Sequence, residues 1–249
     1  NEVPVNFSAE KTEYNLGNND SLTVILKTTT QNRIRIIKSY NFTRASHLIK
    51  VTQSVYNESE VPSDWRQFNT LERGGETSGN RMLYTYTGAA YFNEADKFNK
   101  IEFDEIKEHD FLKKSNDGWI SMIQHYFLTA WIPQPPTDSK QTIYTRSFVD
   151  QTTDKYLIGT VGNYKNINSE EHFDFNTNLY VGPKNQDEIE GIAPGLILTV
   201  DYGFLTFLAA PLFWVLDKIH FLIGNWGWSI ILLTLLIKIV FFKLSETSY

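Results

Sequence analysis

Two polar residues stand four positions apart in the most apolar part of the chain, and their types and spacing could hold water and a positive charge there. Thr234 and Lys238 are the only polar residues between positions 230 and 242. Residues at i and i+4 share one face of a helix, so a hydroxyl and an ammonium would lie side by side. An ionisable group inside an apolar helix is costly unless it serves a purpose or reaches water. The pair favours a hydrated cationic groove, and snorkelling of Lys238 to the membrane surface is the alternative.

Residue types that support catalysis or metal binding are sparse or badly spaced. The chain has no cysteine, and its five histidines stand in no recognisable catalytic spacing. An acidic run is the one cluster of potential metal ligands, but such a run is usually a solvated surface. Its members are Asp104, Glu105, Glu108, His109 and Asp110. No glycine-rich phosphate loop is present. We therefore predict no catalytic residues, no metal and no cofactor.

Charge is distributed unevenly along the chain, and this divides it. The 23 Lys and Arg against 29 Asp and Glu give a net charge of −6, which argues against binding nucleic acid. From Tyr202 to Ile237 the only formal charges are Asp217 and Lys218. The sequence predicts a polar domain at 1–198, an interfacial helix at 199–223 and a transmembrane segment at 224–249. Because the chain starts without Met or a signal pattern, we interpret it as an excised fragment.

The polar domain is rich in short runs with strand periodicity. In Ser21 to Thr29 the apolar side chains alternate, as they do on a half-buried strand. The other predicted strands are Arg33 to Phe42, His47 to Tyr56, Arg81 to Phe92, Trp119 to Ile132, Thr142 to Val149, Lys155 to Val161 and Thr177 to Val181. Residues 94–114 are charged and weakly periodic, and we expect loop and edge strand there. Many strands and scarce helix before Asp187 predict a mainly β protein, an antiparallel β-sandwich.

Residues 201–223 are too apolar for a soluble surface helix, yet Pro211, Asp217, Lys218 and His220 interrupt the run. A helix lying in the membrane interface would bury aromatic side chains while its charges stay in water. The side chains expected to enter the interface are Phe204, Phe207, Leu208, Phe213 and Trp214.

A second helix is predicted after Gly224 and Asn225, which break the pattern. Trp226 and Trp228 are typical of the aromatic belt at a membrane boundary. From Trp226 to Phe242 a helix would rise roughly 25 Å, close to a hydrocarbon core of about 30 Å. The lysines near its end favour a cytoplasmic C-terminal side, which leaves the polar domain in the periplasm.

Four separate stretches of the chain resemble the YidC membrane insertase family of Gram-negative bacteria. They are, in order, GWISMIQHYFLTAWIP (Gly118 to Pro133), LYVGPK (Leu179 to Lys184), LTVDYG (Leu198 to Gly203) and GNWGWSIILLTLLIK (Gly224 to Lys238). The family has similar blocks in the same order, so the resemblance covers nearly the whole chain.

The resemblance implies a periplasmic β-sandwich similar to galactose mutarotases, followed by an interfacial helix and the first, truncated helix of the insertase core. It implies no enzyme activity. It implies insertion and folding of inner-membrane proteins, alone or with the Sec translocon, through a cationic groove. Lys238 stands where the family carries a basic residue, usually Arg, and Thr234 would line the same groove. The implied partners are nascent membrane proteins, Sec translocon subunits and the lipid bilayer.

Two other functions remain open from the residues alone. The sandwich could bind carbohydrate, because mutarotase-like folds elsewhere act on sugars, although a shared fold does not supply a site. It could also dock a partner protein through the aromatic segment 119–132 or through exposed sheet edges.

Overall fold

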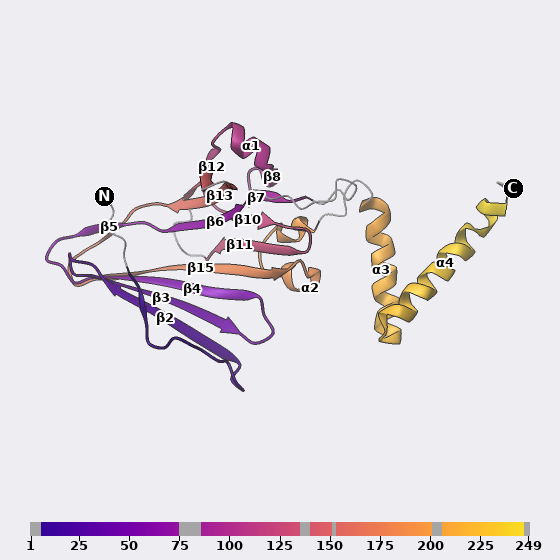
Figure 1. Cartoon of the computed structure of the whole chain (residues 1–249), viewed down its shortest axis with the longest axis horizontal. Coiled ribbons are helices and arrows are strands. Elements are labelled where there is room, and N and C mark those ends of the chain that lie inside the picture. Colours follow the sequence, from indigo (N-terminus) through magenta and orange to yellow (C-terminus); the bar gives the residue numbers. More distant parts are fainter. Residues whose placement is uncertain (1–5, 75–85, 135–139, 151–152, 201–205, 247–249) are drawn as a thin grey trace. The chain divides into compact units, whose positions relative to one another are not determined.

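The computed structural model describes residues 6–74, 86–134, 140–150, 153–200 and 206–246. The chain divides into two compact units, Asn1–Val200 and Asp201–Tyr249. The first unit is built mainly of strands, and the second consists of two helices (Figure 1).

The larger sheet of the first unit has nine strands, and every neighbouring pair is antiparallel. Their order across the sheet is β1 (Ser8–Ala9), β2 (Ser21–Thr29), β3 (Ile34–Thr43), β4 (Leu48–Asn57), β15 (His172–Pro183), β11 (Phe127–Pro133), β10 (Trp119–Ile123), β7 (Gly88–Asn93) and β8 (Lys97–Ile101). The late strand β15 lies between β4 and β11, so it joins the two halves of the sheet (Figure 1).

A smaller sheet packs on the part of the large sheet formed by β10 and β11. Its order is β6 (Phe68–Gly74), β13 (Thr153–Gly162), β12 (Gln141–Asp150) and β9 (Leu112–Ser115). A third pairing joins β14 (Lys165–Ile167) to β5 (Ser63–Trp65). Two layered antiparallel sheets confirm the predicted β-sandwich.

The main core lies between the two layers. Ile143 and Ile158 of the small sheet and Ile120 of the large sheet are fully buried in one cluster. The short helix α1 (Phe103–Glu108) closes this cluster, since Phe103 stacks on Tyr156 with ring centroids 4.5 Å apart. Burial of such side chains is the main favourable term in folding.

A second core covers the opposite face of β10. Trp119 is 1% exposed there and packs with Leu196 of the 3-10 helix η1 (Leu196–Thr199) and with Ile189 of α2 (Gln186–Ile189). The Trp119 indole Nε1 donates a hydrogen bond to the Pro194 carbonyl at 2.9 Å. Because both faces of β10 are covered, all five of its residues are buried.

Most predicted strands are confirmed, although β15 begins five residues before the predicted Thr177, and β1, β5 and β14 were not predicted. Trp119 to Ile132 is two strands, β10 and β11. The loop and edge strand predicted for 94–114 are confirmed in part, since β8 and β9 are both edge strands, but α1 lies between them and was not predicted. Phe103 and Ile106 are three residues apart, and this spacing is enough to bury one face of a short helix. Strand β6 was not predicted, and positions 81–85 of the predicted strand Arg81 to Phe92 lie outside the described residues.

The second unit contains α3 (Thr206–Ile223) and α4 (Trp226–Glu246). They meet at one end and diverge from there (Figure 1). Pro211 lies inside α3, where it removes one backbone hydrogen bond, yet the helix continues past it.

Candidate functional site

The turn between α3 and α4 is held by a small set of specific contacts. Gly224 has φ +70°, a conformation that glycine adopts without strain, and its amide donates to the His220 carbonyl at 2.7 Å. The Asn225 side-chain oxygen accepts from the Gly227 amide at 2.9 Å and so caps α4. The rings of His220 and Trp226 stack with centroids 3.8 Å apart. The predicted break at Gly224 and Asn225 is confirmed as this turn.

One stripe of α4 is less exposed than the rest of the helix. Ser229 is fully buried, and Leu233 and Ile237, at successive i+4 positions, are half-buried. Thr234 and Lys238 each follow a residue of this stripe by one position, about 100° around the helix. The predicted pair therefore lies beside the less exposed stripe and outside it.

Thr234 and Lys238 are both exposed. The Thr234 hydroxyl donates to the Ile230 carbonyl of its own helix at 2.7 Å. That bond uses the only hydroxyl proton, so Thr234 can offer a ligand an acceptor but no donor. The ammonium of Lys238 is consequently the main donor of this face. Whether the pair works in a groove stays a prediction.

The aromatic side chains predicted to meet a membrane are exposed wherever they are described. Phe207 is 76% exposed and Trp228 is 63% exposed, and Phe213, Trp214 and Trp226 are also open to solvent. Phe204 lies outside the described residues.

Polar and apolar positions of α3 are not cleanly separated. At about 100° per residue, Asp217 and Lys218 share a side of the helix with Trp214 and Phe221. The Lys218 ammonium lies 5.9 Å from the centroid of the Trp214 ring. An aromatic expected to enter the interface thus carries a cation over its face, and its interfacial role stays a prediction.

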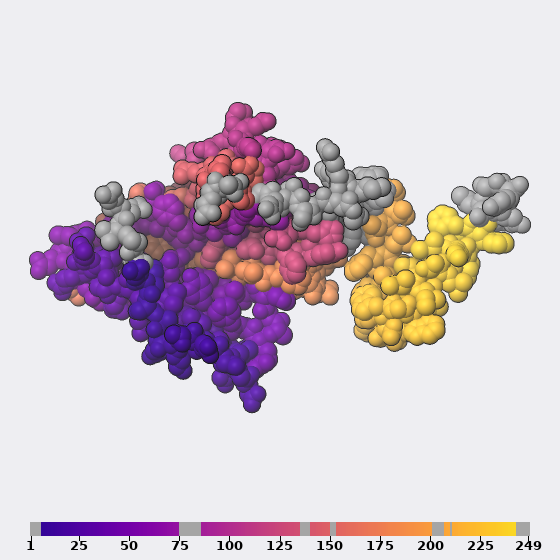
Figure 2. All heavy atoms as spheres, viewed as in Figure 1, coloured from indigo at the N-terminus to yellow at the C-terminus, as the bar shows by residue number. Residues whose placement is uncertain are grey.

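Much of α4 is open to solvent, as the yellow atoms in Figure 2 show. Its exposed apolar side chains are Ile230, Ile231, Leu232, Leu235, Leu236, Ile239, Val240, Phe241 and Phe242. Within the residues that the structure describes, no helix is both long and apolar enough to cross a membrane.

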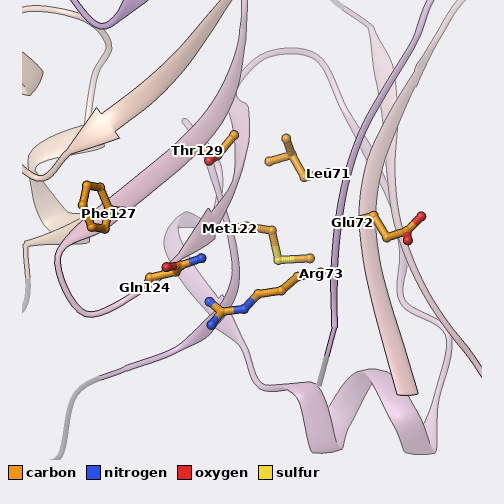
Figure 3. A pocket seen from close by; sticks show the side chains of 7 residues that line it. All are labelled: Leu71, Glu72, Arg73, Met122, Gln124, Phe127 and Thr129. Carbon is orange, nitrogen blue, oxygen red and sulfur yellow. The ribbon is translucent and has the colours of Figure 1, made fainter. Parts of the chain in front are cut away.

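The sandwich carries a small pocket that the sequence analysis missed. It has a volume of about 110 Å³ and lies between β6, β10 and β11. Arg73 extends beside Gln124, whereas Glu72 points away from the pocket (Figure 3). The Arg73 Nη1 atom is buried without a hydrogen-bond partner, and burial lowers the pKa of the guanidinium. The pocket therefore presents a partly desolvated cation.

A second polar cluster joins α2 to the start of β4. The Glu188 carboxylate accepts from the His47 backbone amide at 2.7 Å and lies 2.7 Å from the His47 Nδ1 atom. The ring of His47 packs on Gly182, where an added Cβ would lie 2.5 Å from the His47 Cγ atom. This contact explains the glycine in the LYVGPK stretch.

Burial by itself raises the pKa of Glu188, but the hydrogen bonds from the His47 backbone and ring outweigh it and leave the pKa below its usual value. Burial, helped by the Glu188 charge, raises the pKa of Tyr180 to about 12. The carboxylate is thus held ionised and the phenol neutral. This arrangement suits a structural clamp.

The described residues contain no cluster of potential metal ligands, because no three or more His, Asp or Glu side chains come together. The acidic run of 104–110 lies on α1 and just after it.

Comparison with known proteins places the chain in a family. The family model described as the YidC periplasmic domain matches residues 2–215. The "Membrane protein insertase YidC" of Thioalkalivibrio sulfidiphilus is 42% identical over 245 residues, which cover 98% of this chain and 43% of that protein. The protein of the same name from Aromatoleum aromaticum is 41% identical over 237 residues, covering 92% of this chain and 42% of its own length. The chain thus spans less than half the length of these relatives.

Solved structures resemble the sandwich only distantly. A galactose mutarotase related enzyme from Lactobacillus acidophilus is 12% identical, covers 70% of each chain and has a TM-score of 0.48. An alpha-galactosidase from Lactobacillus brevis is 9% identical, covers 75% of this chain and 27% of that chain, and has a TM-score of 0.46. At this similarity the mutarotase-like form of the sandwich stays a prediction.

The membership of the chain is nevertheless plain, because both the family model and the relatives cover almost all of it. Residues 2–215 carry the periplasmic domain, and the relatives extend the match through α4. The chain belongs to the YidC family of membrane protein insertases.

Proposed function

We propose that this chain is part of an insertase that helps proteins enter and fold in the bacterial inner membrane. The observation that carries the proposal is α4, an apolar helix with exposed side chains on most of its surface and one hydroxyl–ammonium pair on one face. A soluble domain rarely leaves so much contiguous apolar surface open. The proposal agrees with the names of the relatives, which are called membrane protein insertases.

In this proposal the sandwich lies in the periplasm and α3 lies at the membrane interface. Helix α4 enters the bilayer with its C-terminal end toward the cytoplasm. The support for this placement is the exposed apolar surface between Ile230 and Phe242, which hydrocarbon would cover. Trp226 and Trp228 would anchor its first turn at the headgroups.

Lys238 is the residue to which we assign client attraction. A polar or acidic segment of a client pays a large desolvation cost on entering hydrocarbon, and a wet surface with a fixed cation lowers that cost. Because the Thr234 hydroxyl donates to its own helix, Thr234 contributes hydration while Lys238 supplies the charge. Lysine attracts a carboxylate as a point charge and lacks the two-pronged geometry of arginine.

The partners in this proposal are nascent membrane proteins, subunits of the Sec translocon and the lipid bilayer, and nucleic acid is not among them. Docking to the translocon through the sandwich is compatible with insertion. Site-specific cross-linking from exposed positions of the sandwich tests docking separately. Failure to reach any translocon subunit would remove that partner and leave insertion standing.

The test is insertion of a single-span client with an acidic tail into liposomes containing the full-length protein. Wild type is compared with Lys238→Arg, Lys238→Ala and Lys238→Glu, and protease protection of the client is measured. We expect insertion to be kept by Arg, reduced by Ala and lowest for Glu. Lys218→Ala is the matched control, because it removes an exposed lysine of α3 and should leave insertion unchanged.

Two outcomes contradict the proposal in different ways. Normal insertion of the acidic client by Lys238→Glu would reduce Lys238 to a membrane anchor. No insertion by wild type would remove the insertase function and favour a binding module.

A further inference from the structure

The inward face of strand β6 is polar at positions where a sandwich normally places apolar side chains. Asn69, Leu71 and Arg73 alternate along this strand, and Leu71 is buried in the main core. Gln67 continues the alternation one residue before the strand begins. Within the described residues, the buried side-chain atoms that lack any hydrogen-bond partner are Gln67 Nε2, Asn69 Oδ1 and Arg73 Nη1. Two of these side chains therefore lie on one face of β6, and the third lies just before it. Buried polar groups are nearly always paired, so such a concentration calls for a function.

Gln67 and Asn69 line a pocket of about 500 Å³, separate from the Arg73 pocket. Its walls come from the beginning of β6, the end of β13 and the first half of β15, so it lies at one end of the space between the two sheets. Asn69 is 6% exposed and Thr160, on the neighbouring strand, is 3% exposed. Their polar groups are thus held deep in the sandwich and on paired strands.

The two unpaired amide atoms have opposite roles in hydrogen bonding. Gln67 Nε2 is a donor and Asn69 Oδ1 is an acceptor. Both atoms are buried within the fold, so a ligand would reach them only after the two side chains rotate toward the pocket. A ligand hydroxyl accepts and donates at the same oxygen, so neighbouring hydroxyls would then pair with both atoms. Neutral side-chain amides are suited to neutral hydroxyls, because no charge has to be desolvated.

Aromatic surfaces stand in the same wall. Phe173 and Phe175 are half-buried and pack edge to face, with ring centroids 4.8 Å apart. Tyr164 is 63% exposed at the rim. A pyranose ring has an apolar C–H face and a polar hydroxyl edge, so it can lie on such rings while its hydroxyls reach amides. We propose that this pocket, called here the β6 pocket, binds a short neutral saccharide, a binding function separate from membrane insertion.

A peptide strand fits this place less well. Recognition of an extended peptide by strand addition needs a free backbone edge. β15 is paired on both sides, with β4 and β11. β6 is the edge strand of the small sheet, and on it the Thr70 carbonyl accepts a hydrogen bond from the Trp131 indole Nε1 at 3.1 Å. On the β15 side the pocket thus offers side chains rather than an open backbone edge.

The charges around the pocket do not make it an anion or cation site. Lys140, Lys165 and Asp174 line it, and Lys140 and Lys165 are exposed. The Lys165 ammonium lies 4.9 Å from the centroid of the Phe173 ring. Because charges of both signs stand at the pocket, a neutral ligand is favoured.

The test is calorimetric titration of the whole chain in nanodiscs, or in a detergent without a sugar headgroup. The probes are maltotriose, which stands for free oligosaccharides, and triacetylchitotriose, which stands for N-acetylated glycan strands. An uncharged blocked tripeptide is the third probe. We expect millimolar or tighter binding of at least one saccharide, and the preferred probe identifies which source of saccharide the pocket takes.

Gln67→Ala and Asn69→Ala test the site itself. Each should weaken saccharide binding about 3- to 10-fold, the loss expected for one neutral hydrogen bond. Because the two atoms have no partner in the fold, neither variant should lower the melting temperature much. Thr70→Ala is the matched control, since this exposed neighbour on β6 points away from the pocket.

Should either alanine variant fold poorly, titration of wild type followed by NMR of the side-chain amides replaces it. Shifts of the Gln67 and Asn69 NH₂ signals on adding the saccharide support the proposal. Three results would overturn it: no saccharide binding at millimolar concentration, saccharide binding that leaves both amides unaffected, or binding of the tripeptide alone.

Discussion

The two units of this chain treat similar apolar side chains in opposite ways. In β10 of the sandwich, Trp119–Ile123 is buried at every position. In α4, nine apolar residues from Ile230 to Phe242 stay exposed. The sandwich has two layers and a covering segment that bury its apolar runs, whereas α4 packs on α3 and leaves most of its apolar surface exposed. The difference shows that the two units are built for different solvents: water for the sandwich and, in our proposal, lipid for α4.

Each unit also contains polar side chains at positions where its pattern predicts apolar ones. On α4 the exception is an exposed lysine in an apolar helix. At β6 and the residue before it, the exception is a row of two amides and a guanidinium, each with a buried atom that has no hydrogen-bond partner. Each breaks the pattern of its own surroundings, and polar groups that do so cluster at functional sites.

The largest effect is expected where the sandwich has no spare space. Gly118 has φ +101°, and an added Cβ would lie 1.8 Å from the Phe92 carbonyl oxygen. Gly118→Ala should therefore lower the free energy of unfolding of the sandwich by about 4 kcal/mol, from backbone strain and steric overlap together. Thermal or urea denaturation measures it. Gly17→Ala is the control: its φ is +54° with nothing within 4 Å, so it should cost only about 1 kcal/mol.

A truncation placed once in each unit sharpens the comparison. Ile158 is fully buried, and Ile158→Ala should cost about 3 kcal/mol of unfolding free energy by leaving a cavity. The same change at Ile231, which is 57% exposed on α4, should leave sandwich unfolding unchanged. Equal losses at both positions would mean that the helices and the sandwich unfold as one cooperative unit.

Membrane affinity should depend on α4 and not on the sandwich, whereas the free energy of unfolding depends on the sandwich. Leu235→Asp replaces an exposed apolar residue of α4 and should weaken partition of the chain into phospholipid vesicles by about 3 kcal/mol, roughly 100-fold. Vesicle flotation measures this. Leu112→Asp, at a sandwich leucine that is 73% exposed, is the matched control and should float as wild type does. Loss of flotation in both variants would contradict the division between the units.

The smallest effect concerns the clamp of Glu188 and its dependence on pH. The pKa of Glu188 is lower in the fold than in the unfolded chain, so its contribution is complete above the unfolded value of about 4.3 and is lost as pH falls through the folded value. Glu188→Gln should cost about 1 to 2 kcal/mol at neutral pH. Denaturation curves of the two proteins should converge in acid. Exposed Glu190→Gln should show neither loss, and a constant difference at all pH values would exclude ionisation as the cause.

Much of the sandwich could be predicted because its strands alternate. Ser21 to Thr29 was predicted and observed with the same bounds. Strand β6 was missed for a physical reason: its inward positions alternate between amides, leucine and arginine, so it lacks the apolar period that reveals a strand. Helix α1 was missed because six residues are too few for a helical period to stand out from charged neighbours.

The candidate sites divide in the same way. Thr234 and Lys238 were predictable, since a polar pair four residues apart in an apolar run is a local pattern. Gln67 and Asn69 were not, because only pairing of β6 with β13 and packing on β10 and β11 turns these side chains into the sandwich.

The sequence by itself determined the mainly β fold, the separation of a polar domain from an apolar tail, the turn at Gly224 and the family. These depend on composition and on the spacing of apolar side chains over a few residues, and both can be read directly from neighbouring positions in the chain. Only the tertiary structure decided that β15 joins the two halves of the large sheet, that Glu188 meets His47 and that Gln67 and Asn69 line a pocket. Those contacts join residues more than 40 positions apart, and the free energy that fixes them comes from burial shared between whole layers.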